Sequence, residues 1–179
     1  MILWPVHGSV IARTLDGYPE TSYNASMLRI ALAGLHLLAL GLGLGAVISR
    51  GTILREPPTA ASLSRAFRAD TLWGIAAALW IGTGLWRVLA SSEKSMQYYL
   101  HNHLFYTKMG LLAAILALEI WPMMTLIRLR VAMAREEAGE LSERSSTLAR
   151  IATISHIEAA IVVIMVFVAA AMARGYGAL

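Results

Sequence analysis

The chain has 179 residues, of which 58% are hydrophobic and 15% are charged, and its mean hydropathy is +0.62. A soluble domain typically has about 45–50% apolar residues, so this composition indicates a protein that is solvated mainly by lipid. The chain has no cysteine, which excludes disulfides, iron–sulfur clusters and thiolate-ligated haem. The net charge of +4 requires no nucleic-acid partner, because basic loops beside anionic lipid headgroups explain it equally well.

The first residues, "MILWPVHG", have no basic region ahead of the apolar ones, which argues against a cleaved signal peptide. The segment that follows is too short and polar to cross a membrane. Trp4 and Tyr18 suit a position at the membrane interface. We therefore expect residues 1–27 to form an outward-facing tail, and residues 28–179 to form the membrane domain.

Four apolar stretches follow, and each approaches the ~20 residues that a helix needs to cross the hydrocarbon. They are Ile30–Ile48, Thr71–Trp86, Met109–Ile127 and Ile151–Ala173. The fold class predicted is all-α, an integral membrane four-helix bundle with an N-terminal interfacial segment.

Positive charge predicts the orientation. Nine of the fifteen Lys and Arg residues lie in the two connections on one side of such a bundle. They are Arg50, Arg55, Arg65, Arg68, Arg128, Arg130, Arg135, Arg144 and Arg150. This side should be cytoplasmic, which places both termini outside a multi-pass protein of the bacterial inner membrane.

Small residues recur at helical spacing in the first two stretches, as Gly41 and Gly45 and as Gly74, Ala78 and Gly82. Such faces allow close helix approach. We expect them to be buried in helix contacts, either within the bundle or against other membrane subunits or a second copy of the chain.

Ionisable residues inside membrane helices cost about 2.5–3.5 kcal/mol each if uncompensated, and here they form two layers. The outer layer contains His36 and Lys108. The inner layer, expected near the cytoplasmic surface, contains Asp70, Glu119, His156 and Glu158. Of these, Asp70 looks like a helix N-cap, and Glu119 should face protein and either pair with a cation or hold a proton.

The proton-handling candidates are Glu119, His156 and Glu158. His156 and Glu158 are about 160° apart on a helix, so they should not point at one centre.

The stretch "YYLHNHLFYTK", from Tyr98 to Lys108, combines interfacial aromatic residues with possible ligands. One interpretation is the outer rim of a cofactor or metal site, with His101 and Lys108 as ligands or proton carriers. The simpler interpretation is an aromatic belt beside a helix that Asn102 caps.

Longer segments resemble a known family. "FRADTLWGIAAALWIGTGLWRV", "YYLHNHLFYTKMGLL" and the terminal "ARGYG" are similar to an uncharacterised family of bacterial predicted membrane proteins, domain of unknown function 2214. The resemblance runs from about Met27 to Gly177.

A weaker resemblance concerns "GLHLLALGLGLGAVISR", "GLW" and "HLFYTKMGLL", which are similar to the haem-b-binding four-helix protoporphyrinogen oxidases and, more loosely, to copper-resistance membrane domains. It implies that His36 and Lys108 serve a haem and its reaction. "EIWP" replaces the histidine-containing end of the oxidases' third helix, so haem binding is favoured over oxidase activity.

Haem b would need an imidazole, a close backbone approach and polar groups for its propionates. His36 would bind iron and Gly43 would face the macrocycle. Arg87, Lys94, Tyr98 and Tyr99 would hold the propionates. The second axial ligand stays open between Lys108, His101 and a methionine, and a five-coordinate iron fits equally well. His36 and His101 are the metal-ligand candidates.

Two functions remain open. The first is a protein that binds haem b or another metal cofactor in the outer half of the bundle, with electron transfer or a porphyrin or quinone oxidoreductase reaction as its activity. The second is a non-catalytic accessory or assembly subunit of a larger membrane complex.

Overall fold

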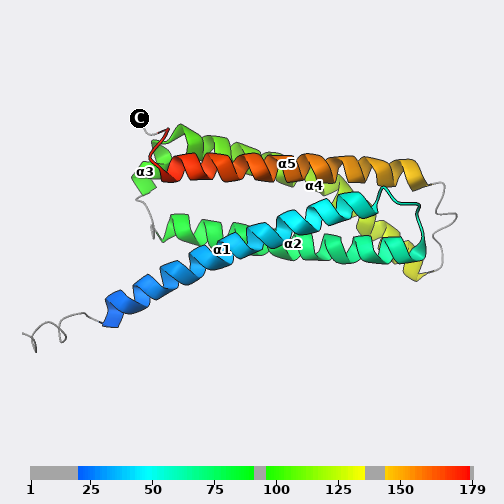
Figure 1. Cartoon of the computed structure of the whole chain (residues 1–179), viewed down its shortest axis with the longest axis horizontal. Coiled ribbons are helices and arrows are strands. Elements are labelled where there is room, and N and C mark those ends of the chain that lie inside the picture. The colour runs from blue at the N-terminus through cyan, green and yellow to red at the C-terminus, as the bar shows by residue number, and fades with distance from the viewer. Residues whose placement is uncertain (1–19, 91–95, 136–143, 178–179) are drawn as a thin grey trace, which may run out of the picture.

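The computed structural model describes residues 20–90, 96–135 and 144–177 (Figure 1). Within these ranges the chain is helical and contains no strand. The helices are α1 (Glu20–Ile53), α2 (Ala60–Leu89), α3 (Met96–Leu100), α4 (His103–Ala134) and α5 (Ser145–Ala173). The predicted interfacial position of Trp4 and Tyr18 lies outside the described residues, and α1 already begins at Glu20.

Four of these helices are long and apolar enough to cross a membrane: α1 from Ser26, α2, α4 and α5. The prediction of an all-α four-helix membrane bundle is therefore confirmed. With 29 residues or more, each helix exceeds the ~20 residues that a crossing needs. Their ends therefore extend beyond the hydrocarbon, and the arginine-rich turns of α2, α4 and α5 are helical rather than loops.

The start of α2 differs from the prediction. Thr59 is the N-cap, and its side chain and that of Ser62 form a capping box with the backbone. Reciprocal bonds of this kind satisfy two of the free N–H groups at a helix start. Asp70 is therefore not a cap, and it lies inside α2, ten residues after the helix begins.

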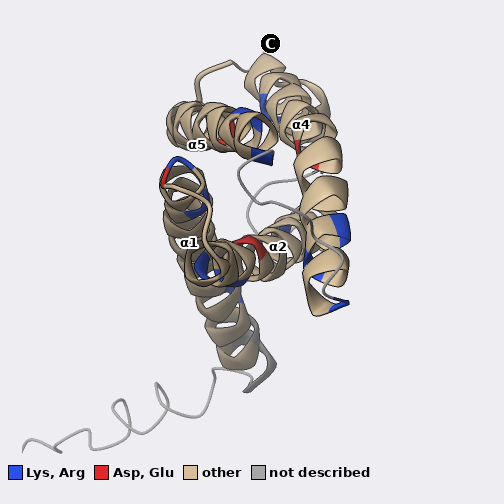
Figure 2. Ribbon diagram, turned by 90° about the vertical axis from the view of Figure 1, so that its right-hand side faces the viewer, with Lys and Arg blue, Asp and Glu red and all other residues tan. Residues whose placement is uncertain are grey.

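The helices pack in two pairs, α1 with α2 and α4 with α5, and α1 joins the pairs by also packing on α5 (Figures 1 and 2). One apolar cluster, which includes Val47, Trp73 and Val162, fills the middle of the bundle. A second cluster, which includes Leu63, Leu126 and Ile151, fills the arginine-rich end. The first turns of α1 extend away from the other helices (Figure 1).

The glycines do not pack as predicted. Gly43 is buried instead: a β-carbon there would lie 3.2 Å from the Trp73 ring, so its missing side chain admits an indole of α2. The predicted contact residues are exposed in the monomer, and at the glycines among them a β-carbon would meet nothing within 4 Å. They are Gly41, Gly45, Gly74, Ala78 and Gly82. Burial of these faces inside the bundle was the wrong prediction.

Candidate functional site: an arginine bound by three carboxylates

Arg50, in the last turn of α1, is completely buried and lies at the middle of a polar cluster. Its Nη1 donates to Asp70 Oδ1 at 2.8 Å and to Glu119 Oε1 at 2.7 Å. Its Nη2 donates to Glu119 Oε2 at 2.7 Å and to Glu158 Oε2 at 2.8 Å. Its Nε donates to Ser155 Oγ at 3.0 Å. Because a guanidinium has five N–H donors, every one of them is used. We call these five residues the Arg50 centre.

All four membrane helices contribute to the Arg50 centre. Arg50 comes from α1, Asp70 from α2, Glu119 from α4, and both Ser155 and Glu158 from α5. Ser155 and Glu158 are three residues apart, which puts them on one face of α5. Bidentate bonding of the kind made to Glu119 is the strongest form of arginine–carboxylate contact. The centre therefore connects the two helix pairs through charge-assisted hydrogen bonds.

Arg130 supports the centre from the side. Its Nη2 donates to the Phe67 carbonyl and to Thr71 Oγ1, and it lies 3.8 Å from the second oxygen of Asp70. The guanidinium also stacks on the Phe67 ring, at 4.9 Å from the ring centroid. Arg130 thus links α4 to α2. It lies beside Asp70 Oδ2, whereas Arg50 binds Oδ1 of the same carboxylate.

The centre lies at mid-length of α4 and α5 and near the end of α1. At 1.5 Å per residue, Glu119 is about 22 Å from either end of α4, and Glu158 is about 20 Å from either end of α5, whereas Arg50 is in the last turn of α1. Arg128 and Arg150, which mark the basic end, lie about 12 Å from the level of the two glutamates. The assignment of Arg50 to a loop is therefore wrong, and the depth of the acids relative to the cytoplasmic surface stays a prediction. The prediction that Glu119 faces protein and has a cationic partner is confirmed.

His156 lies beside the centre but does not join it. Its Nδ1 donates to the Ala152 carbonyl at 2.6 Å. A β-carbon on Gly51 would lie 2.6 Å from the His156 ring. The imidazole therefore packs directly on the backbone of α1, one residue after Arg50, while Glu158 points into the centre.

His36 lies in the contact between α1 and α2, with 9% of its surface exposed. Thr83 Oγ1 donates to the Leu79 carbonyl at 2.7 Å and lies 2.9 Å from His36 Nδ1, so it accepts a hydrogen bond from that nitrogen. The ring lies 5.9 Å from that of Trp80, and a β-carbon on Gly84 would lie 3.1 Å from it. A hydroxyl of the neighbouring helix thus satisfies this imidazole.

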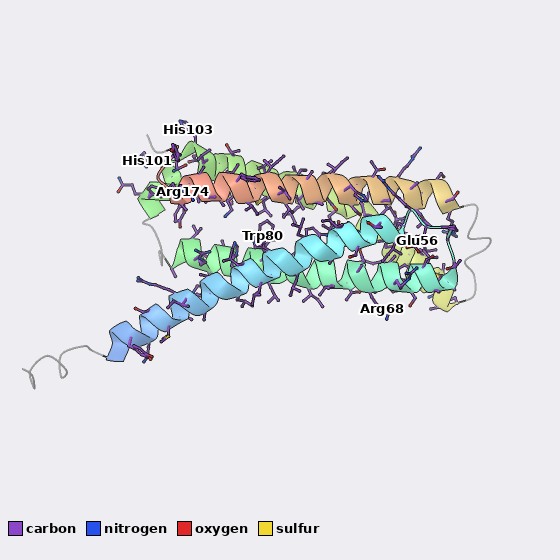
Figure 3. The ribbon with its side chains drawn as sticks, in the orientation of Figure 1. Glu56, Arg68, Trp80, His101, His103 and Arg174 are labelled. Carbon is purple, nitrogen blue, oxygen red and sulfur yellow. The ribbon has the colours of Figure 1, made fainter. Side chains whose placement is uncertain are left out.

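Most of the other residues proposed for a haem site do not converge on His36. Lys108 and Arg87 lie close enough to interact with it electrostatically. Tyr98 instead donates its hydroxyl to the Met172 carbonyl at 2.8 Å. His101 is exposed at the end of the bundle beside His103 (Figure 3) and bonds the Gln97 carbonyl. Tyr99 is buried against the Phe105 ring.

The segment from Tyr98 to Lys108 has a different role, which is to hold the C-terminal end of α5. Asn102 caps α4 as predicted, by accepting from the Leu104 N–H, and its amide donates to the Tyr176 carbonyl. The His103 N–H donates to the Gly177 carbonyl. Gly177 has a φ of +79°, and a β-carbon there would lie 2.7 Å from Leu104. Only glycine tolerates both constraints, which explains the terminal "ARGYG".

Within the described ranges, no group of three or more His, Asp or Glu side chains is arranged to hold a metal ion. The three carboxylates that do converge direct oxygens to one guanidinium. The Arg50 centre is therefore an ionic arrangement, formed around a cation that the chain itself supplies.

A family model described as "Predicted membrane protein (DUF2214)" matches residues 28–177. The chain belongs to this family. The match includes the whole Arg50 centre and ends at Gly177, the last residue of the contact between Asn102 and the C-terminal segment. No curated protein and no solved structure matches this DUF2214 chain.

Proposed function

We propose that this DUF2214 protein binds and releases protons at the Arg50 centre, as the proton-handling part of a coupled process in the membrane. The observation that carries the proposal is a charge imbalance. Three carboxylates contact one buried guanidinium, so the fully ionised centre has a net charge of −2, or −1 with Arg130 included. Like charges in a medium of low dielectric constant disfavour one another's ionised forms, so the centre retains at least one proton.

Glu158 is the carboxyl group best suited to hold that proton. Its side chain is completely buried, Oε2 binds Arg50, and Oε1 has no hydrogen-bond partner. Glu158 and Glu119 both bind Nη2 of Arg50, which brings two carboxyl groups to one nitrogen. Protonation of Glu158 would remove the repulsion between them while the bonds to Arg50 persist.

Asp70 and Glu119 supply the route for exchange. Their side chains are 12% and 18% exposed, whereas Arg50 and Glu158 are not exposed at all. Among the groups that bind Arg50, these two carboxylates reach the surface of the bundle, and we propose that a proton enters the centre through them.

Infrared difference spectroscopy of the protein in lipid, recorded as the pH is changed, tests the proposal. We expect the carbonyl stretch of a protonated carboxyl group in the wild type and its loss in Glu158→Gln. Glu56→Gln is the matched control, because Glu56 also pairs with an arginine but is exposed. If the wild type shows no such band at any pH at which it is folded, the centre is a fully ionised structural contact and the proposal fails.

Proton flux into proteoliposomes, followed with a pH-sensitive dye under an imposed membrane potential, tests the coupled process itself. The wild type should respond, and Glu158→Gln should reduce the response to that of empty vesicles. If Glu158→Gln left the flux unchanged, the proton held at the centre would take no part in transport, and the coupled process would be refuted.

Haem b fits the arrangement around His36 poorly. The imidazole is enclosed by Trp80, Thr83 and Gly84, Gly43 is covered by Trp73, and α1 would have to separate from α2 to admit a macrocycle. Haem binding at His36 stays a prediction that an absorption spectrum of the purified protein tests. A Soret band that is lost in His36→Ala would support it.

An accessory or assembly role has one observation in its favour. The small-residue faces of α1 and α2 point out of the monomer with nothing packed on them, and such faces suit contacts with another membrane helix. Replacing Gly45 by Leu should then reduce the size of the complex on a native gel, whereas a monomeric wild type would rule out self-association through this face.

A further inference from the structure

An open groove of about 530 Å³ lies between α4 and α5. It is lined by Trp121 of α4 and by Ala149, Arg150, Thr153 and Ile154 of α5. The α5 residues form two pairs four positions apart, which places them along one strip of the helix. The groove therefore runs parallel to the helices rather than into the bundle.

The chemistry of the groove changes along its length. Trp121 is two residues from Glu119, about 3 Å in helix rise from the level of the Arg50 centre, whereas Arg150 is eight residues from Glu158, about 12 Å toward the basic end. Trp121 and Ile154 form an apolar inner part, and Arg150 forms a cationic outer part. This is the polarity of a lipid in one leaflet, with its acyl chain inward and its headgroup at the surface.

Arg150 is available for a ligand. It is exposed, and it forms no ion pair with any other residue that the structure describes. Trp121 is 42% exposed, so its indole lies open on the side of the groove. Basic pockets between membrane helices are known to bind anionic headgroups, and a lone cation above an apolar strip meets that description.

We propose that this groove binds an anionic phospholipid, with the phosphate or the acidic headgroup on Arg150 and an acyl chain along Trp121 and Ile154. Charge complementarity selects this occupant: a zwitterionic lipid would bring a second cation to Arg150, and an acidic protein segment would leave the apolar inner part uncovered. The site is independent of the proposed proton chemistry, because none of its five lining residues belongs to the Arg50 centre.

Quenching of tryptophan fluorescence by brominated lipids tests the proposal on the full chain in proteoliposomes. The signal of Trp121 is obtained by subtracting the Trp121→Phe variant, since the chain has five tryptophans. We expect brominated phosphatidylglycerol to quench this component at a lower mole fraction than brominated phosphatidylcholine does. Equal quenching by the two lipids would overturn the headgroup selectivity.

Arg150→Gln then tests the cation. It should lower the preference for phosphatidylglycerol about fivefold, the ratio that about 1 kcal/mol per basic residue near a membrane corresponds to. Arg68→Gln is the matched control, because Arg68 is exposed at the same end of the molecule but on α2 (Figure 3). If both variants lower the preference equally, the general surface potential explains it and the groove is not a site. If acidic peptide rather than lipid competes at the groove, the occupant is a protein segment and the proposal is wrong.

Discussion

Replacing Arg50 by Met should destabilise the protein more than any other single substitution of a charged residue. Methionine retains the unbranched aliphatic part of arginine, but it removes the guanidinium and all five of its hydrogen bonds. Asp70, Glu119 and Glu158 would then face one another without a cation. The variant thus removes both the compensating charge and the hydrogen bonds that join the four helices.

The structure sets the magnitude. Breaking a buried ion pair by removing one partner costs about 3–5 kcal/mol, and Arg50 has three acidic partners instead of one. Protonation of the carboxyl groups left behind limits the loss, because a neutral acid is far less costly in lipid than a charged one. We therefore expect a loss of about 3–5 kcal/mol in the free energy of unfolding rather than three times that value.

Reversible unfolding in mixed micelles, followed by circular dichroism, measures this loss. Arg65→Met is the matched control, because Arg65 also bonds a glutamate, Glu56, at 2.6 Å, but the two side chains are 50% and 42% exposed. Exposed pairs of this kind contribute about 0–1 kcal/mol. The two variants make the same chemical change and differ in burial and in the number of partners.

A rescue variant separates lost charge from lost shape. Arg50→Met combined with Asp70→Asn, Glu119→Gln and Glu158→Gln has no buried charge left, and well-packed neutral replacements for buried ion networks are often tolerated. We expect the combination to recover at least half of the stability that Arg50→Met loses. A loss below 1 kcal/mol in Arg50→Met, or no recovery in the combination, would refute the reasoning.

The remaining predictions concern packing, the C-terminal contact and topology. Gly51→Ala should lower the free energy of unfolding by about 1–3 kcal/mol, because the added methyl group would lie 2.6 Å from the His156 ring and must displace it. Gly41→Ala is the control: its methyl group meets nothing within 4 Å, so the variant should be neutral or slightly stabilising in the same unfolding assay. Asn102→Ala should cost about 1–2 kcal/mol through loss of its cap and should speed hydrogen exchange in the last turn of α5, and unchanged exchange would contradict the contact. A cysteine at exposed Ser146 should react with an impermeant reagent only from the cytoplasm, and one at exposed His103 only from outside; the reverse pattern would invert the predicted topology.

Much of the fold could be predicted from the sequence because the membrane imposes strong constraints. A run of about 20 apolar residues must be helical in lipid, so the four spans followed directly from composition. The helix ends were less predictable, since the basic turns beyond the hydrocarbon carry no apolar signal. The capping box at Thr59 and Ser62 marks the start of α2. Two hydroxyl residues three positions apart, ahead of a stretch of small and apolar residues, could have predicted this helix start from the sequence.

The sequence predicted that Glu119 has a partner, but it did not predict the Arg50 centre as a whole. The cost of an unpaired carboxylate in lipid correctly required a partner for Glu119, but single-helix reasoning did not identify that partner. Arg50 was counted among the loop cations because it follows the apolar run of α1 and precedes a glycine. Three acids at similar depth on separate helices required a cationic partner, but several arginines lie next to an apolar run, so the sequence did not single out Arg50. Side-chain packing between helices, as between Gly43 and Trp73, has no comparable signal in one sequence.

The arrangement of the Arg50 centre itself argues against a purely structural role. One carboxylate bound in the bidentate manner would neutralise the arginine, and each further ionised group costs about 2.5–3.5 kcal/mol at the middle of a membrane helix. The chain nevertheless places two more acids there, from two other helices, and leaves Oε1 of the most buried one without a hydrogen-bond partner. Since every N–H of Arg50 is already used, that oxygen is free to hold a proton without breaking any bond of the guanidinium. This is the arrangement that the proposed proton exchange requires, because Glu158 can take up a proton while the four helices stay joined through Arg50.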